Sequence, residues 1–267
     1  MQKIISYLIN NMAFYPDKYF QASIPKNSSE VFIKAIDGTK LLGLMLENNE
    51  SDKIVIYFHG NAGNIYSRIP DLNKIRNMGF NVFGLSYRGY AKSEGEPSEK
   101  GIYQDGDAAF DYIVNHLGFK LENIFIIGRS IGSAVAVNVA QYKKIKGLIL
   151  ITPLTNAKQL SKNMGFGMLS SFIGSVFDNK AKIKNIISPL LIIHGSKDDV
   201  IPYKMGVELY NKANNPKQFI KIKNAVHNNL SDEHGAEYFK AIERFLHKGY
   251  ILTTNSFKQA ATGAIFA

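Results

Sequence analysis

Short runs of apolar residues alternate with segments of helical periodicity over most of the chain. From residue 54 onward several runs are apolar throughout, such as IVIYF, IFIIG, LILIT and LLIIH. Continuous apolar runs are typical of parallel strands that helices cover on both faces. We therefore expect strands at Val31–Ile36, Leu41–Leu46, Ile54–Phe58, Val82–Tyr87, Ile124–Gly128, Gly147–Thr152, Leu190–His194 and Phe219–Lys223.

The connections between these strands indicate how the sheet is built. Asp37-Gly38-Thr39 joins the first two strands, and Asp-Gly at that position predicts an antiparallel hairpin. Helix-length segments separate the later strands, at 67–78, 98–116, 132–144, 203–213 and 232–247. This repetition predicts an α/β fold, a doubly wound and mostly parallel sheet with right-handed crossovers. We expect a single domain over 1–267, with functional residues at the carboxyl ends of its strands.

The interval 154–187 is longer than one crossover helix requires. Apolar side chains are interspersed with glycine there, namely Met164, Phe166, Met168, Leu169, Phe172, Ile173, Val176 and Phe177. One interpretation is an ordinary amphipathic helix with its connections, and the other is a small lid segment over a site. The tail 251–267 has no clear period, and no structure is assigned to it.

The N-terminal segment 1–14 places Ile4, Ile5, Leu8, Ile9 and Met12 on one helical face. One interpretation is a helix docked on the core, and the other is peripheral association with a membrane surface. No stretch of the chain reaches the roughly 18 consecutive apolar residues that a transmembrane helix needs. We therefore expect a cytoplasmic protein, with attachment to the membrane periphery as the second interpretation.

Composition narrows the chemistry. Lys+Arg 32 against Asp+Glu 22 gives a net charge of 32 − 22 = +10, but only 5 of these cations are Arg and the 27 Lys are scattered. Scattered lysine favours a solvated surface over a nucleic-acid interface, where forked arginine contacts are expected, so we expect no nucleic-acid partner. The chain has no cysteine. Disulfides, cysteine-ligated metals and a thiol nucleophile are therefore excluded.

One pentapeptide lies where a strand is expected to give way to a helix. Gly128-Arg-Ser-Ile-Gly132 follows the apolar run IFII and precedes an Ala/Val-rich segment. A G-x-S-x-G turn in this context strains the serine backbone and presents its hydroxyl above the sheet, and only small residues fit two positions before and two positions after the serine. Ser130 is therefore the candidate nucleophile.

A serine nucleophile needs a base, and the base needs an acid that orients it. With this turn, the partners follow along the chain in the order acid, then histidine. Asp198 is our choice for the acid in the loop after Leu190–His194, with Asp199 as its close competitor. His227 lies in the loop after the last strand and is the histidine that satisfies both chain order and sheet edge.

The glycine-rich loop His59-Gly-Asn-Ala-Gly-Asn64 follows the strand Ile54–Phe58. Such a loop offers a backbone N–H to a developing oxyanion without interference from side chains. We expect the N–H groups of Asn61 and Ile131 to be the two oxyanion donors.

Taken together, these motifs resemble the α/β-hydrolase superfamily. HGNAGN, YRGYAKSEGEPSEKG (87–101), GRSIGS, HGSKDDVIP and VHNNL occur in the order of one branch, over roughly residues 30–247. That branch holds the bud-emergence-type hydrolases and depalmitoylating abhydrolase-domain proteins, near the serine aminopeptidase-like group. It usually has Gly where this chain has Ala91, and often Gly where it has Ser133. The histidine is commonly followed by Asn-Asp, here Asn228-Asn229, and Arg88 and Arg129 match the pattern as scaffold-holding residues.

The resemblance implies hydrolysis of small-molecule carboxyl esters or thioesters, with small to medium acyl groups, by Ser130, Asp198 and His227. It implies neither a metal nor an organic cofactor. Two alternatives stay open, which are a serine peptidase with the same residues and a catalytically inactive binding protein on the same fold.

Overall fold

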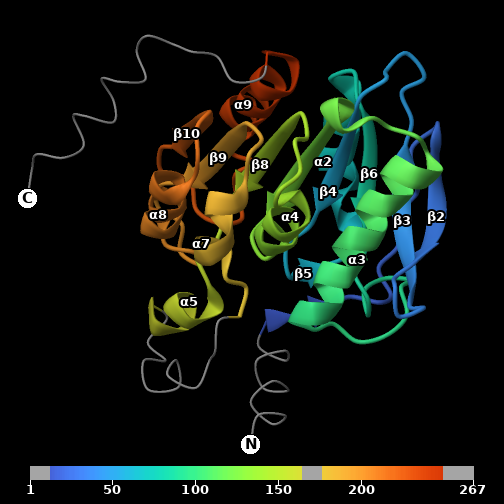
Figure 1. Ribbon diagram of the computed structural model, residues 1–267, viewed down its shortest axis with the longest axis horizontal. Helices are drawn as coiled ribbons and strands as arrows, with labels where there is room; N and C mark the ends of the chain where they lie inside the picture. The colour runs from blue at the N-terminus through green and yellow to red at the C-terminus, as the bar shows by residue number, and fades with distance from the viewer. Residues whose placement is uncertain (1–12, 164–175, 249–267) are drawn as a thin grey trace, which may run out of the picture.

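The computed structural model describes residues 13–163 and 176–248. Within these ranges an eight-stranded sheet has the order β10-β9-β8-β7-β4-β6-β3-β2, and it crosses the molecule from left to right in Figure 1. The strands are β2 (Ser28–Lys34), β3 (Lys40–Leu46), β4 (Ile54–Phe58), β6 (Asn81–Leu85), β7 (Ile124–Arg129), β8 (Gly147–Ile151), β9 (Leu190–Gly195) and β10 (Lys217–Ile222). All neighbours from β10 to β6 pair in parallel, whereas β6–β3 and β3–β2 are antiparallel. The predicted mostly parallel sheet and its N-terminal hairpin are confirmed.

The continuous apolar runs are explained by burial on both faces. Every residue of β4, β6, β7, β8 and β9 is buried. The helices α3 (Glu99–Asp111), α4 (Gly132–Ala140) and α8 (Tyr203–Lys212) pack with one apolar cluster, and α2 (Ile69–Asn77) and α9 (Gly235–Lys248) pack with the other. Parallel strands between two helix layers place their carboxyl ends at one edge, where loops from distant parts of the chain meet.

Two expected helices differ from the structure at their ends. The helix expected over 98–116 ends as α3 at Asp111 and continues as a π-helical turn, Tyr112–His116. The helix expected over 132–144 ends at Ala140, because Gln141 is extended (ψ 134°) and Tyr142 adopts the left-handed conformation (φ 58°). These ends lie away from the motif loops and leave them unchanged.

A two-residue parallel pair was not expected from the sequence. β1 (Tyr15–Pro16) pairs with β5 (Ala62–Gly63), which lies in the glycine-rich loop after β4. The N–H groups of Tyr15 and Asp17 donate to the carbonyls of Asn61 and Gly63, at 3.1 and 3.2 Å. The beginning of the described chain is therefore fastened to this loop.

The segment 154–187 is described only in part. It contains α5 (Ala157–Asn163) and α7 (Asn179–Lys182), and the Phe177 ring packs edge-on against Phe14 with ring centroids 6.0 Å apart. Most of its expected apolar residues lie in 164–175, outside the described residues, so both the lid and the single-domain boundaries stay predictions. Residues 1–12 of the N-terminal segment and the tail from 249 onward also lie outside.

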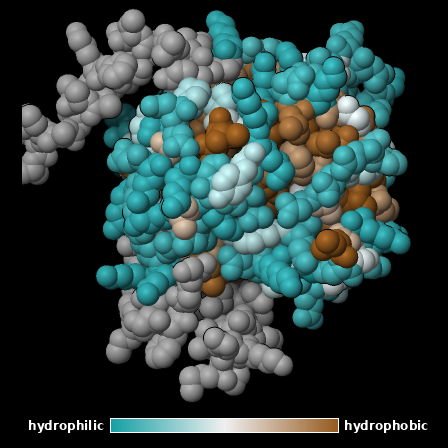
Figure 2. Space-filling view, viewed as in Figure 1, coloured by the Kyte–Doolittle hydropathy of each residue, from teal (hydrophilic) through white to brown (hydrophobic). Residues whose placement is uncertain are grey.

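One face of the molecule shows how polar and apolar residues are distributed on its surface. On the face shown in Figure 2, hydrophilic residues cover most of the area and apolar residues gather in separate places. No helix in 13–163 or 176–248 has both the length and the apolar character to cross a membrane.

Candidate active site

Ser130 occupies a sharp turn between β7 and α4. Its backbone is left-handed (φ 54°), which is the strain that the G-x-S-x-G motif predicts. The two glycines are sterically required, because a Cβ on Gly132 would lie 2.2 Å from the Phe58 carbonyl oxygen and one on Gly128 would lie 2.5 Å from the Gly132 carbonyl oxygen. The close contact with Phe58 also brings the start of α4 against the end of β4.

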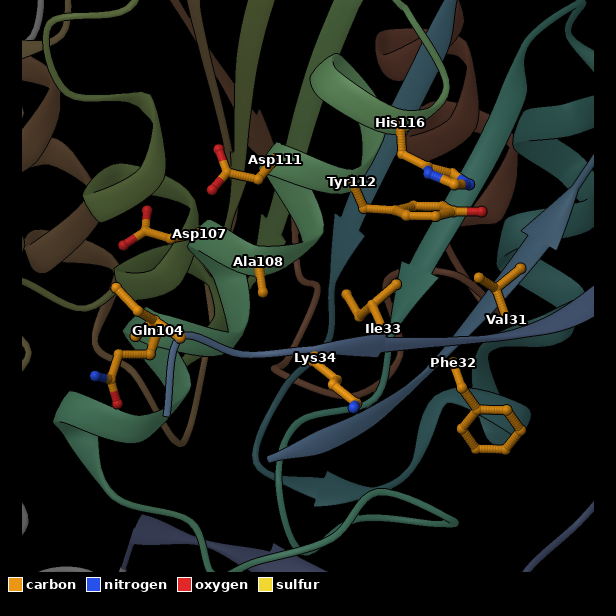
Figure 3. A pocket seen from close by; sticks show the side chains of 11 residues that line it. Val31, Phe32, Ile33, Lys34, Gln104, Asp107, Ala108, Asp111, Tyr112 and His116 are labelled. Carbon is orange, nitrogen blue, oxygen red and sulfur yellow. The ribbon is translucent and has the colours of Figure 1, made fainter. Parts of the chain in front are cut away.

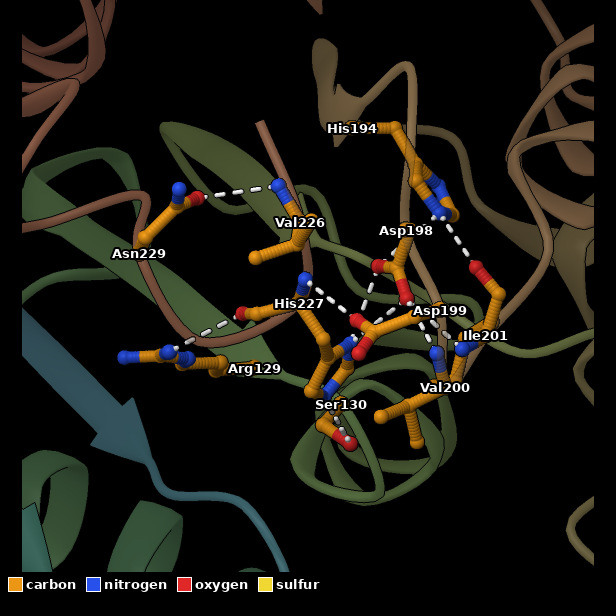
Figure 4. A network of polar contacts seen from close by, with 10 residues as sticks. All are labelled: Arg129, Ser130, His194, Asp198, Asp199, Val200, Ile201, Val226, His227 and Asn229. Carbon is orange, nitrogen blue, oxygen red and sulfur yellow. Dashed lines mark hydrogen bonds and ion pairs between the residues drawn. The ribbon is translucent and has the colours of Figure 1, made fainter. Parts of the chain in front are cut away.

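The structure brings Ser130, His227 and Asp198 together from three separate loops (Figure 4). His227 Nε2 lies 3.2 Å from Ser130 Oγ, and its Nδ1 lies 2.9 Å from Asp198 Oδ2. A carboxylate only accepts hydrogen bonds, so Nδ1 carries the proton and Nε2 is left to accept the serine hydroxyl. Ser130 and His227 are 8% and 6% exposed. The arrangement can remove a proton from the serine hydroxyl in a site with little water.

The two candidate aspartates have different contacts. Asp198 Oδ1 accepts the N–H groups of Val200 and Ile201 at 3.0 and 2.7 Å, in addition to its contact with the His227 ring. Burial of Asp198 opposes ionisation, but hydrogen bonds from His194 and His227 outweigh it and hold the pKa of the carboxyl well below its ordinary value. Asp199 instead accepts the backbone N–H of His227 at 3.2 Å. Asp198 is therefore the aspartate that touches the imidazole.

The glycine-rich loop lies directly against the serine. A Cβ on Gly60 would lie 3.5 Å from Ser130 Cβ. His59 Nδ1 donates to the Gly60 carbonyl at 2.6 Å, and because the C=O and N–H of a trans peptide point in opposite directions, this contact fixes the direction of the Asn61 N–H. Within the described ranges, neither the Asn61 N–H nor the Ile131 N–H has an intramolecular acceptor. Both expected oxyanion donors are thus available beside Ser130.

Arg129 contacts the loop that carries His227. Its Nη2 donates to the His227 carbonyl at 3.3 Å, and its Nη1 lies 3.9 Å from Asp71 Oδ2. Burial raises the pKa of Asp71, an effect that the nearby Arg129 charge opposes. Sequence reasoning gave Arg129 a scaffold role, which these contacts agree with.

His59 and His194 are the functional neighbours that sequence reasoning passed over. Each lies at the carboxyl end of a buried strand just before a glycine, His59 directly after β4 and His194 as the last residue but one of β9; each is fully buried and contacts part of this site. The histidine-glycine pair at both strand ends was the available signal, but only the fold shows what each ring touches.

A groove of about 760 Å³ lies elsewhere, between the edge strand β2 and helix α3 (Figure 3). It is lined by Val31, Phe32, Ile33, Lys34, Ile36, Gln104, Asp107, Ala108, Asp111, Tyr112 and His116. None of the residues expected to carry chemistry lines it. In the described part of the chain, no group of three or more acidic or histidine side chains is suited to a metal ion.

Comparison with known proteins identifies the family of the chain. The sequence model of the alpha/beta hydrolase fold matches residues 53–172. The bem46 protein of Schizosaccharomyces pombe is 33% identical over 223 residues, which span 80% of this chain and 74% of that protein. The chain belongs to the α/β-hydrolase family. Within this family, the YfhR protein of Escherichia coli K12 is 30% identical over 88% of this chain and 86% of its own length. Alpha/beta hydrolase domain-containing protein 17B of Xenopus tropicalis is 30% identical over a region that spans 84% of this chain and 77% of that protein.

Solved α/β-hydrolase structures share the fold. The esterase Pf2001 of Pyrococcus furiosus superposes with a TM-score of 0.75 at 22% identity, and the match covers 90% of this chain and 99% of that one. An α/β hydrolase of Vibrio vulnificus gives a TM-score of 0.68 at 21% identity, with 90% and 85% covered. The predicted fold class and the predicted family resemblance are both confirmed.

Proposed function

We propose that the protein is a serine hydrolase that cleaves carboxyl esters or thioesters with small to medium acyl groups. The observation that carries the proposal is the continuous hydrogen-bonded path from Asp198 Oδ2 through His227 to Ser130 Oγ, with distances of 2.9 and 3.2 Å. The esterase names of several structural neighbours and the abhydrolase names of the sequence relatives support the same chemistry.

The first half of the reaction acylates the enzyme. Ser130 Oγ attacks the carbonyl carbon as His227 Nε2 takes the hydroxyl proton, and Asp198 stabilises the imidazolium that forms. The N–H groups of Asn61 and Ile131 stabilise the negative oxygen of the tetrahedral intermediate. The intermediate collapses when the bond to the alcohol or thiol breaks, and His227 returns the proton to the leaving group.

The second half releases the acyl group. Water attacks the Ser130 ester while His227 again takes a proton, and the second tetrahedral intermediate breaks to give the carboxylic acid. The proton on His227 returns to Ser130 Oγ, so the protein ends the cycle unchanged.

Labelling with a fluorophosphonate and hydrolysis of nitrophenyl esters test the proposal. We expect Ser130→Ala to abolish labelling and to lower kcat by about 10⁴-fold or more. Ser133→Ala is the matched control, because Ser133 is also a buried serine in this turn but its Oγ contacts Asn179 Nδ2 at 3.2 Å. Full activity in Ser130→Ala would contradict the proposal.

A second measurement determines which acyl chain length and which type of bond the enzyme prefers. Nitrophenyl esters of increasing chain length, matched thioesters and aminoacyl amides should be compared at equal enzyme concentration. We expect short and medium esters or thioesters to be turned over fastest. Faster turnover of the amides would favour the peptidase, and a folded protein that neither labels nor hydrolyses any of them would favour a binding protein.

A further inference from the structure

A second histidine contacts the acid of the site. His194 lies near the end of strand β9, is fully buried, and places Nε2 3.4 Å from Asp198 Oδ2 and 2.9 Å from the Ile201 carbonyl oxygen (Figure 4). We propose that His194 is a positioning residue that fixes the plane of the Asp198 carboxylate for His227. The inference rests on the proposed function and adds a residue to it.

The need for such a residue follows from how the carboxylate is held. Oδ1 is fixed by two backbone N–H groups, those of Val200 and Ile201. The planar carboxylate turns as a unit about the Cβ–Cγ bond, so a contact at Oδ2 adds to the restraint that the two N–H groups place on Oδ1. His227 Nδ1 contacts both oxygens, at 3.1 Å from Oδ1 and 2.9 Å from Oδ2, but the His227 ring gains and loses a proton in every cycle. His194 is the contact to Oδ2 that takes no part in proton transfer.

The surroundings of His194 fix which nitrogen carries its proton. Both groups near Nε2 are acceptors, so Nε2 carries the proton; the N–H donates to the Ile201 carbonyl at 2.9 Å, and Asp198 Oδ2 lies 3.4 Å from the same nitrogen. Nδ1 is buried and has no hydrogen-bond partner among the described residues. A proton on Nδ1 would therefore have no acceptor, so the polar Nε2–H group is the one that faces Asp198 Oδ2.

Close packing by helix α8 holds the ring in this position. A Cβ on Gly206 would lie 2.3 Å from His194 Nδ1, so a glycine is required for the helix to approach this edge. The Tyr203 ring packs edge-on against the imidazole with centroids 5.7 Å apart. Gly206 and Tyr203 therefore pack against the imidazole from helix α8.

A matched pair of variants tests the proposal. Glutamine places its amide nitrogen near the position of Nε2, whereas the shorter asparagine reaches only the position of Nδ1. We expect His194→Asn to lower kcat about tenfold with KM nearly unchanged, because the polar N–H that faces Asp198 Oδ2 is lost. We expect the kcat of His194→Gln to stay within about threefold of wild type, since the N–H of the glutamine amide takes the place of the imidazole Nε2–H. Thermal melting of each variant checks folding.

Two kinetic outcomes would overturn the proposal. One is wild-type kcat in both variants, and the other is an equal fall in both while their melting temperatures match wild type. Should the asparagine variant fail to fold, nitrogen-15 NMR of the imidazole rings of the wild-type protein decides. The signal that disappears in His194→Gln must show protonated Nε2 and bare Nδ1 at neutral pH, and a protonated Nδ1 overturns the inference.

This NMR measurement needs no turnover, so it separates the two proposals. If the wild-type protein neither labels nor hydrolyses esters, the proposed function fails whatever the tautomer of His194. If the wild-type protein is active and His194→Asn matches it, only the positioning role fails.

Discussion

At the scale of single residues, the two adjacent aspartates divide their contacts between the ring and the backbone of His227. Asp198 Oδ2 contacts Nδ1 at 2.9 Å, whereas Asp199 Oδ1 accepts the backbone N–H at 3.2 Å. Orienting the imidazole and stabilising its charge requires the first contact. The contact of Asp199 with the backbone N–H holds the loop that carries His227.

The pair Asp198→Asn and Asp199→Asn should therefore separate in activity. We expect Asp198→Asn to lower kcat by about 10³- to 10⁴-fold, since an amide at this position favours the wrong imidazole tautomer. Asp199→Asn keeps an acceptor oxygen and should stay within about fivefold of wild type, on the scale of a single neutral hydrogen bond. Steady-state hydrolysis of a nitrophenyl ester measures both, and a larger loss in Asp199→Asn would reverse the assignment.

His59 makes a different prediction, which concerns stability. Full burial, helped by the Arg68 charge, lowers the pKa of His59 to about 3. The ring stays neutral in the folded protein but takes up a proton on unfolding below the unfolded pKa of about 6.5. The unfolded state thus binds more protons, and the free energy of unfolding falls as the pH drops from 6.5 toward 3.

Urea unfolding between pH 7 and pH 4.5 tests this sign. Between these limits His59 should account for about 2–3 kcal/mol of lost stability. His59→Asn should remove that part of the slope, whatever its effect at pH 7, while His116→Asn at an exposed position should leave the slope as in wild type. Equal slopes in wild type and His59→Asn would contradict the buried neutral ring.

At the scale of elements, two close approaches involve helix α4 and require glycine. A Cβ on Gly132 would lie 2.2 and 2.5 Å from the carbonyl oxygens of Phe58 and His59, and a Cβ on Gly106 of α3 would lie 2.4 Å from a methyl carbon of Val135. The first contact meets the backbone of the loop that holds Asn61. The second meets a side chain between two helices, away from the site.

Alanine at these two glycines should therefore have different consequences. We expect both variants to be destabilised by about 1–3 kcal/mol or more, because overpacking forces neighbours to shift. Gly132→Ala should also lower kcat, because it displaces Ser130 relative to the oxyanion loop. Gly106→Ala should keep the kcat of the folded fraction near wild type. Thermal melting with active-site titration separates the effects, and a normal kcat in Gly132→Ala would count against the oxyanion loop.

The elements themselves could largely be predicted from the sequence, because burial on both faces leaves a continuous apolar run in each central strand. The pairing of β1 with β5 could not be predicted. Two residues in each strand are too few to form a periodic pattern, and the two segments meet only in the folded chain. The site loops could be predicted for Ser130 and His227, whose chemistry and chain order are distinctive. The proposed role of His194 could not be predicted, because it depends on the loop after β9 bringing the Asp198 side chain back beside the His194 ring.

At the scale of the whole molecule, Arg88 connects three separate parts of the chain. Its guanidinium lies 2.7 Å from Asp105 of α3 and 2.8 Å from Asp37 of the β2–β3 connection. The Asp105 side chain is fully buried, whereas the Asp37 side chain is 37% exposed. Burial raises the pKa of Asp105, and the Arg88 contacts oppose that rise.

Removing either partner should reveal this asymmetry. We expect Asp105→Asn to cost about 3–5 kcal/mol, because it leaves a buried guanidinium without its main counter-charge. Asp37→Asn should cost much less, since water screens an exposed pair. Urea denaturation with unchanged m-values measures both, and equal losses would show that burial does not set the strength of this connection.

The two-residue pair of β1 with β5 can open without the eight-stranded sheet unfolding, because the two are separate sheets. So short a ladder opens locally at a small fraction of the free energy needed to unfold the sheet. Heating would therefore remove the β1 contacts from the loop that carries Asn61, which keeps its hydrogen bonds with His59 and Tyr90, while the core stays folded. The temperature at which hydrolysis peaks would then be set by this N-terminal clamp and the melting temperature by the sheet, and activity lost between the two would return on cooling.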